Sequence, residues 1–159
     1  MGQRMVTAMT HTNLVHDTIT VTQLVNAPVA DVWQAYADTA VRAQWSVPSG
    51  DGLEYDSDEF VTGGNATYRC GTPDVLEFAV VVDYVLVESP RLIVYTETLG
   101  TQDAPLATSL VTWEFDESPK GTSIVVTNQT TSFVGEDMMT GMLNGHRIAL
   151  QQLAERFEP

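Results

Sequence analysis

Residues 53 to 132 consist of short apolar segments separated by turn residues, with no helical spacing of apolar side chains between them. Alternating apolar and polar residues predict strands, and glycine or proline pairs between them predict hairpin turns. We place strands at residues 54–61, 65–71, 76–88, 91–99, 107–117 and 121–132. Strands joined by short turns pair antiparallel, so this stretch predicts a meander with a face that another element must cover.

The segments on either side of the meander add one strand and three helices. Residues 17–26 alternate apolar side chains with threonine, which predicts the first of seven strands. Two short helices follow, at residues 28–37 and 39–45, and Pro28 suits a first helical turn.

The last segment, from residue 137 to 157, predicts one long amphipathic helix. Its apolar stripe advances in steps of four and three residues and comprises Met139, Leu143, His146, Leu150, Leu153 and Phe157. Gly141 and Gly145 each cost about 1 kcal/mol of helix propensity, so packing on the sheet must stabilise this helix. We therefore expect an α+β fold, a seven-stranded curved antiparallel sheet around the helix with an apolar cavity between them.

Length, hydrophobic content and net charge limit the class of protein to which this chain can belong. The 159 residues with 43% hydrophobic content predict one domain, at 17–159, after a flexible tail at 1–16. With neither a signal-peptide core nor an apolar run of the roughly 20 residues that span a bilayer, we expect a cytoplasmic protein. The net charge of -14 disfavours nucleic acid and membrane surfaces as partners.

Strand parity and helix spacing select the candidate site. Cys70 is the only cysteine, and the sequence has no phosphate loop or zinc spacing, so we predict no cofactor and no metal. The side chains that we expect to line the cavity or its mouth, and so to bind ligand, are Trp33, Trp45, Tyr68, Cys70, Phe78, Val80, Trp113, Val126, Asn128, Met139, Met142, Leu143 and His146.

Charged groups near these positions allow more than one reading. His146 is either a ligand contact, a core histidine with a hydrogen-bond partner, or an acid or base, and we favour the ligand contact. We expect Arg69 to be solvated, because period-two parity turns Tyr68 and Cys70 inward instead. The acids at 54, 56, 58 and 59 predict a solvated strand edge rather than a Ca²⁺ site.

Five local motifs, in their order and spacing, resemble one known family. They are Val25 to Trp33, Trp45, Gly63-Gly64, Glu88 to Leu92 and Gly145 to Leu153. Together they resemble the START-like (SRPBCC, Bet v-type) superfamily, in particular its branch of activator of heat-shock-protein-90 ATPase homologue-like proteins. The resemblance implies a helix-grip fold with a hydrophobic cavity, although His146 stands where this branch often has tryptophan.

The superfamily includes lipid and hormone binders, polyketide cyclases and antibiotic self-resistance proteins, so fold alone does not choose a function. We expect a protein that binds a small hydrophobic or aromatic molecule, because the sequence has no recognisable catalytic constellation. One alternative is a polyketide cyclase/dehydratase-like enzyme that uses His146 with Arg69 or Asn128. Another is a stress-linked co-chaperone-like interaction protein. Residues 78–82 are apolar on both faces, which suggests a homodimer contact or a cover of loops or tail.

Overall fold

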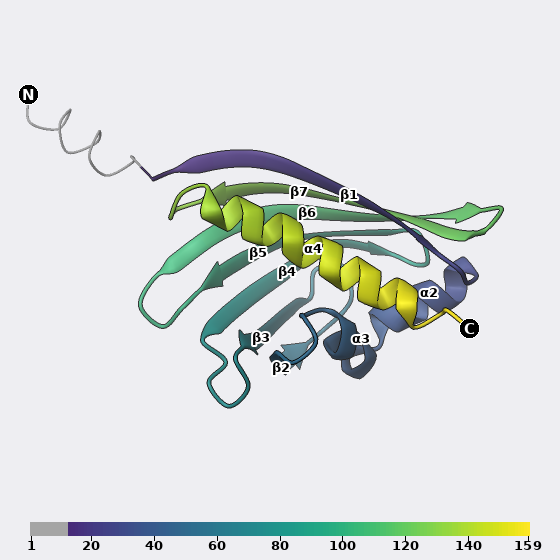
Figure 1. The fold of residues 1–159 in the computed structure, drawn as a ribbon, viewed down its shortest axis with the longest axis horizontal. Coiled ribbons are helices and arrows are strands. Elements are labelled where there is room, and N and C mark those ends of the chain that lie inside the picture. The colour runs from purple at the N-terminus through teal and green to yellow at the C-terminus, as the bar shows by residue number, and fades with distance from the viewer. Residues whose placement is uncertain (1–12) are drawn as a thin grey trace, which may run out of the picture.

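The computed structural model describes residues 13–159, which form a curved antiparallel sheet with three helices (Figure 1). The seven strands lie in the order β1-β7-β6-β5-β4-β3-β2. Their bounds are β1 Val15–Val25, β2 Gly52–Asp58, β3 Asn65–Gly71, β4 Phe78–Glu88, β5 Leu92–Gly100, β6 Pro105–Ser118 and β7 Gly121–Ser132. The helix-grip fold expected from the sequence is confirmed.

Two short helices, α2 (Val29–Ala37) and α3 (Thr39–Trp45), connect β1 to β2. The Asp38 carboxylate accepts a hydrogen bond from the Val41 amide at 3.1 Å, which caps α3. The indole nitrogen of Trp45 donates to the Ala35 carbonyl at 3.1 Å, so the two helices are tied together. They close one end of the sheet, as Figure 1 shows.

The C-terminal helix α4 (Asp137–Glu155) runs across the sheet and contacts β1, β7 and α3. Figure 1 shows it lying nearer to β1 and β7 than to β2 and β3. Its C-terminal half is buried through Ala149, Leu150, Leu153 and Ala154, whereas Met139 is the buried residue of its first half. The helix is therefore anchored at one end and stands over a less densely filled region at the other.

Aromatic side chains fill the anchored end of the molecule. Tyr36 of α2 lies edge-on to Trp113 of β6, with ring centroids 5.0 Å apart. Trp33 packs against Phe115 at 5.3 Å in the same edge-on manner. These offset contacts, which are favourable for aromatic pairs, make the core that holds the short helices on the sheet.

Several boundaries differ from the sequence-based expectations. Strand β1 begins at Val15, and both Val15 and His16 pair with β7, so the expected tail ends earlier than residue 16. Residues 1–12 of that tail lie outside the described residues. Strand β2 ends at Asp58, because the Glu59 amide bonds to the Asn65 carbonyl at 2.8 Å and turns the chain.

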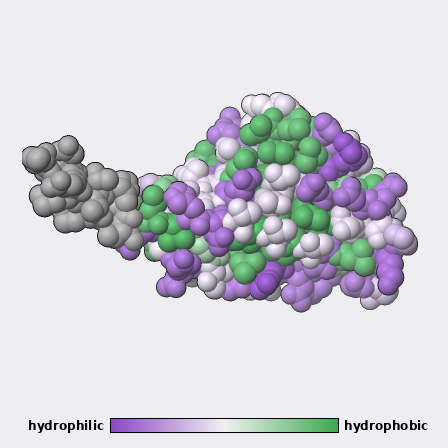
Figure 2. Space-filling model, turned by 90° about the horizontal axis from the view of Figure 1, so that it is seen from above, coloured by the Kyte–Doolittle hydropathy of each residue, from purple (hydrophilic) through white to green (hydrophobic). Residues whose placement is uncertain are grey.

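The outer face of β4 is open to solvent in the described part of the chain. Val81 and Val85 are 49% and 54% exposed there. On the face seen in Figure 2, apolar areas alternate with polar ones. The homodimer contact expected on residues 78–82 stays a prediction. Within residues 13–159, none of the helices has the length and apolar character needed to cross a bilayer.

Candidate ligand-binding pocket

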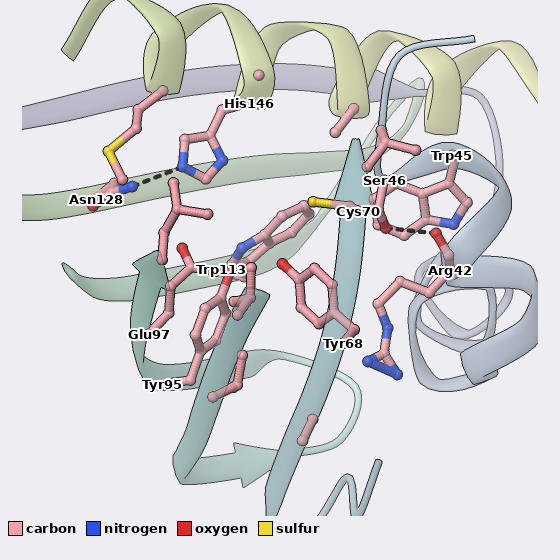
Figure 3. A pocket seen from close by; sticks show the side chains of 18 of the residues that line it. Arg42, Trp45, Ser46, Tyr68, Cys70, Tyr95, Glu97, Trp113, Asn128 and His146 are labelled. Carbon is pink, nitrogen blue, oxygen red and sulfur yellow. Dashed lines mark hydrogen bonds between the residues drawn. The ribbon is translucent and has the colours of Figure 1, made fainter. Parts of the chain in front are cut away.

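A pocket of about 290 Å³ lies beneath the N-terminal half of α4 (Figure 3). Strands β2 to β7 form its floor and sides, and α2 and α3 close one end. Its walls carry the aromatic side chains Tyr36, Trp45, Tyr55, Tyr68, Tyr84, Tyr95 and Trp113. Ligand pockets are usually apolar and aromatic with a few polar groups, and this one has that character.

The roof of the pocket is a single face of α4. Its members are spaced by three and one residues and are Met138, Gly141, Met142, Gly145, His146 and Ala149. A Cβ atom added to Gly141 or Gly145 would meet no atom within 4 Å. Both glycines therefore leave space beneath the helix rather than allow a close approach of two backbones.

Eight of the thirteen residues that the sequence suggested for the site line this pocket. They are Trp45, Tyr68, Cys70, Val80, Trp113, Asn128, Met142 and His146. Strand parity was a sound guide for this set, because each strand residue among them lies on the concave face. Their role in binding stays a prediction.

The other five lie outside the lining. Trp33 and Val126 are 6% and 1% exposed and belong to the packed core. Met139 and Leu143 lie on α4 beside the roof, on a helix face rotated away from it. Phe78 is the half-buried first residue of β4. The apolar stripe of α4 thus serves mainly for packing, and the roof is the adjacent face.

His146 and Asn128 form a polar pair at the top of the pocket. The Asn128 amide nitrogen donates to His146 Nε2 at 2.9 Å, drawn as a dashed line in Figure 3. A nitrogen that accepts this bond carries no proton, so in the neutral ring the proton is on Nδ1. Burial lowers the pKa of His146 to about 4. The imidazole is therefore uncharged at neutral pH.

Glu97 of β5 is a pocket residue that the sequence analysis missed. It shares the concave face with Ile93, Tyr95 and Leu99, and its carboxyl group points into the pocket (Figure 3). Burial raises the pKa of Glu97 to about 7, and the Tyr68 hydroxyl offsets part of this rise. An acid at an inward position of a strand was the signal available in the sequence.

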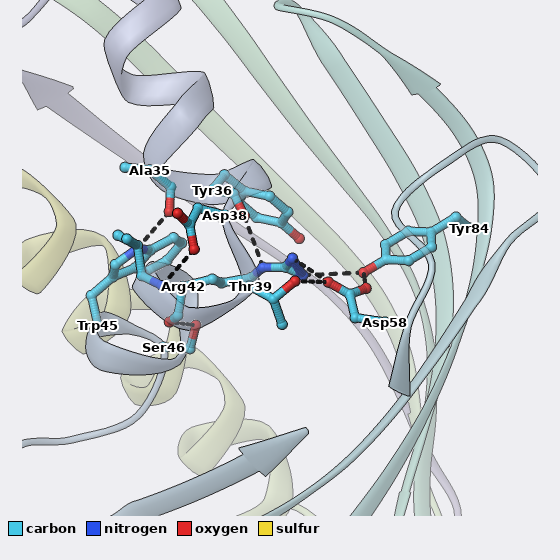
Figure 4. Close-up of polar contacts among 10 residues, drawn as sticks. Ala35, Tyr36, Asp38, Thr39, Arg42, Trp45, Ser46, Asp58 and Tyr84 are labelled. Atoms are coloured by element: carbon cyan, nitrogen blue, oxygen red, sulfur yellow. Dashed lines mark hydrogen bonds and ion pairs between the residues drawn. The ribbon is translucent and has the colours of Figure 1, made fainter. Parts of the chain in front are cut away.

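Arg42 of α3, also missed, forms a buried ion pair with Asp58 of β2 (Figure 4). The guanidinium lies 2.6 Å from the Asp58 carboxylate and donates to the Tyr84 hydroxyl and the Tyr36 carbonyl. Asp58 also accepts hydrogen bonds from the hydroxyls of Tyr84 and Thr39. The expected solvated edge is therefore wrong for Asp58.

A β-bulge explains the position of Asp58. The register of β2 on β3 shifts between Tyr55 and Ser57, which leaves Asp56 as an extra residue. The bulge reverses the parity of the residues that follow, so Asp58 points inward while Asp56 remains exposed. Arg69 lies within 3.6 Å of Glu54 and Asp56 on the outer surface, in agreement with its expected exposure.

Two pocket-lining residues each have a buried polar atom without a hydrogen-bond partner among the described residues. These atoms are the indole nitrogen of Trp113 and the side-chain oxygen of Asn128. Buried polar atoms are normally hydrogen-bonded, so these two are exceptions in the packing around the pocket. No group of three metal-ligating side chains occurs within residues 13–159.

Comparison with known proteins places the chain in a family. The family model described as Activator of Hsp90 ATPase homolog 1-like protein matches residues 26–158. No curated protein sequence matches the chain significantly.

Solved structures share the fold. A protein from Rhizobium leguminosarum is 26% identical, with 89% of this chain and 94% of that one covered and a TM-score of 0.80. The Mll3558 protein from Rhizobium loti is 28% identical, with 90% and 98% covered and a TM-score of 0.79. DynU16, from the dynemicin biosynthetic locus, is 20% identical, with 87% and 46% covered and a TM-score of 0.66, and supports the fold alone.

The family model covers most of the chain, and the structural neighbours share the sheet and the long helix. The protein therefore belongs to the Activator of Hsp90 ATPase homolog 1-like family of the START-like superfamily.

Proposed function

We propose that this protein binds a small, largely apolar or aromatic molecule in the pocket beneath α4. The supporting observation is the space of about 290 Å³ among seven aromatic side chains. This volume is close to the lower end of the roughly 300–1,000 Å³ typical of ligand pockets. Because protein interiors are close-packed, a space of this size within an aromatic shell suits a guest molecule.

The composition of α4 supports the proposal. Gly141 and Gly145 lie inside the helix, where each costs about 1 kcal/mol relative to alanine. Neither contacts a neighbour closely enough to require the missing side chain. The benefit of glycine at these two positions is therefore the open volume beneath the roof.

Uptake of the neutral dye N-phenyl-1-naphthylamine, followed by its fluorescence, tests this proposal. We expect saturable binding to the wild-type protein and at least tenfold weaker binding to Gly145→Met, whose side chain fills the pocket. The matched control is Asn144→Met, which places the same side chain on the exposed face of α4. No uptake by the folded wild-type protein, or equal uptake by Gly145→Met, contradicts the proposal.

A second candidate is an acid–base enzyme of the cyclase or dehydratase type. It is favoured by the presence of Glu97 and the neutral His146 in one pocket, because a group with a pKa near 7 both gives and takes protons efficiently at neutral pH. Asn128 orients His146, whereas Arg69 points outward and has no part in this version.

Replacement of Glu97 and of His146 tests this second candidate function. With β-hydroxy ketone probes as substrates for dehydration, Glu97→Gln and His146→Phe should each reduce turnover by 100-fold or more. Both variants should retain the dye. Turnover that is absent in the wild-type protein, or unchanged in both variants, rejects this candidate and leaves the binding proposal intact.

A further inference from the structure

Glu97 is an acid that faces the pocket and has no cationic partner among the residues that the structure describes. Its carboxyl group projects from β5 into the pocket, whose walls also carry the aromatic side chains of Tyr68 and Tyr95 (Figure 3). Among residues 13–159, every ion pair of the structure involves other acids. A buried carboxylate without a cation is costly, and the cost falls when a positive charge arrives beside it.

The other charges of the pocket do not supply that cation. Arg42 lines the pocket, but Asp58 balances its charge at 2.6 Å. The Tyr36 ring also covers the Arg42 guanidinium, whose central carbon lies 4.8 Å from the ring centroid. One cation and one anion therefore cancel at the α3 end, and Glu97 remains as the acid of the pocket that has no cation beside it.

The remaining titratable groups that face the pocket are uncharged near neutral pH. Burial raises the pKa of every tyrosine in the walls, namely Tyr36, Tyr55, Tyr68, Tyr84 and Tyr95. Burial also raises the pKa of Cys70 on β3 to about 11 and lowers that of His146 on α4 to about 4. None of these groups competes with a ligand for Glu97 by charge.

We propose that the pocket selects a small aromatic amine in its cationic form, with the ammonium group on the Glu97 carboxylate and the apolar part among the aromatic walls. This inference rests on the proposed binding function. The faces of tyrosine and tryptophan rings attract cations, so the walls favour an ammonium group as well as an apolar skeleton.

The field of the whole molecule acts in the same direction. The chain carries a net charge of -14. Such a field concentrates small cations near the surface and repels anions, and the effect is strongest at low ionic strength. An amine therefore arrives more often than its neutral or acidic counterpart of the same size.

Three probes that share one phenyl-ethyl skeleton separate charge from shape: 2-phenylethylamine, 2-phenylethanol and phenylacetate. Calorimetric titrations at pH 8 and 0.15 M salt should give at least tenfold tighter binding of the amine than of the alcohol, and the weakest binding for phenylacetate. Glu97→Gln should bind the amine no better than the alcohol.

The pH dependence gives a second readout. The pKa of Glu97 is about 7 in the empty pocket, while an alkyl amine stays charged up to about pH 10. Affinity for 2-phenylethylamine should therefore rise about tenfold from pH 6 to pH 8, as the carboxyl group ionises. Affinity for 2-phenylethanol, and the amine affinity of Glu97→Gln, should not change in this way.

The controls separate failure of this inference from failure of the binding function. Glu114→Gln removes an exposed acid outside the pocket and should leave the amine preference intact. If the dye binds but the amine binds no better than the alcohol, or if Glu97→Gln keeps the preference, the amine inference is wrong and the binding function stands. If the folded protein takes up neither the dye nor any probe, both are wrong.

Discussion

The side-chain nitrogen of Asn128 on β7 lies 2.9 Å from Nε2 of His146 on α4, so a hydrogen bond joins the sheet to the imidazole in the roof of the pocket. This bond requires an unprotonated Nε2, and burial acts in the same direction by disfavouring the imidazolium. The pair therefore fixes both the ring orientation and its tautomer.

The first prediction concerns the titration of this histidine. In ¹⁵N NMR spectra, His146 should remain neutral with its proton on Nδ1 from pH 8 to about pH 5, because its pKa is lowered to about 4. Asn128→Leu removes the donor to Nε2 and should raise the pKa toward the ordinary value. An imidazole that titrates near pH 6.5 in the wild-type protein is incompatible with this environment.

The second prediction concerns stability against pH, where Glu97 and His146 act in opposite directions. The raised pKa of Glu97 stabilises the fold below its unfolded value of 4.5, and this contribution is lost as the pH rises through about 7. The lowered pKa of His146 stabilises the fold above 6.5, and this contribution is lost as the pH falls toward about 4. Each contribution amounts to about 3 kcal/mol at most. Between pH 5 and 6.5 one contribution falls with rising pH while the other rises, so the free energy of unfolding changes little with pH there.

Single substitutions should separate the pH dependences that Glu97 and His146 each give to the free energy of unfolding. In urea unfolding experiments, Glu97→Gln should lose stability as the pH falls from 7 to 5, because only the His146 contribution remains. His146→Gln should instead lose stability as the pH rises over the same interval. The exposed Glu114→Gln serves as the control and should follow the wild-type curve. Parallel curves for all four proteins would show that folding does not shift the pKa of either Glu97 or His146.

The third prediction concerns the buried ion pair. The side chains of Arg42 and Asp58 are 5% and 3% exposed. Arg42→Met should destabilise the protein by about 3–5 kcal/mol, because it leaves the Asp58 carboxylate buried without its cation. The exposed pair of Arg91 and Glu88 offers a matched control, and Arg91→Met should cost less than about 1 kcal/mol. Similar costs for the two substitutions would contradict the structural role given to Arg42.

The fourth prediction concerns the roof of the pocket. Gly145→Ala should raise the free energy of unfolding by about 1 kcal/mol, because the helix gains propensity and the added Cβ meets nothing within 4 Å. Asn144→Ala on the exposed face should gain up to about 0.7 kcal/mol without affecting the pocket. Thermal unfolding measures both. A loss of stability in Gly145→Ala would mean that the space beneath α4 is smaller than the structure indicates.

The fold could be predicted from the sequence because apolar side chains alternate clearly along the strands and recur every three to four residues along α4. Alternation along β6, for example, turns Val111, Trp113 and Phe115 inward, and all three are buried. The spacing of Leu150 and Leu153 likewise identifies the buried face of α4. Patterns of this kind depend only on local backbone geometry, so they can be recognised in the sequence before any tertiary contact is known.

The positions of the charged residues in and beside the pocket could not be predicted in the same way. The inward position of Asp58 depends on a bulge at Asp56, which no residue pattern marked in advance. Arg42 and Asp58 come from a helix and a strand that only the tertiary fold brings together. Glu97, by contrast, follows the parity of Tyr95, and a stricter use of alternation would have found it.

The central claim is that a small apolar molecule enters the pocket beneath α4. Methyl NMR of the methionines during titration with N-phenyl-1-naphthylamine tests it most directly, because Met138 and Met142 line the pocket and Met139 does not. We predict saturable shifts of the Met138 and Met142 signals, clearly larger than that of Met139 and absent in Gly145→Met. Unchanged signals at saturating dye, or shifts that persist in Gly145→Met, would contradict the claim.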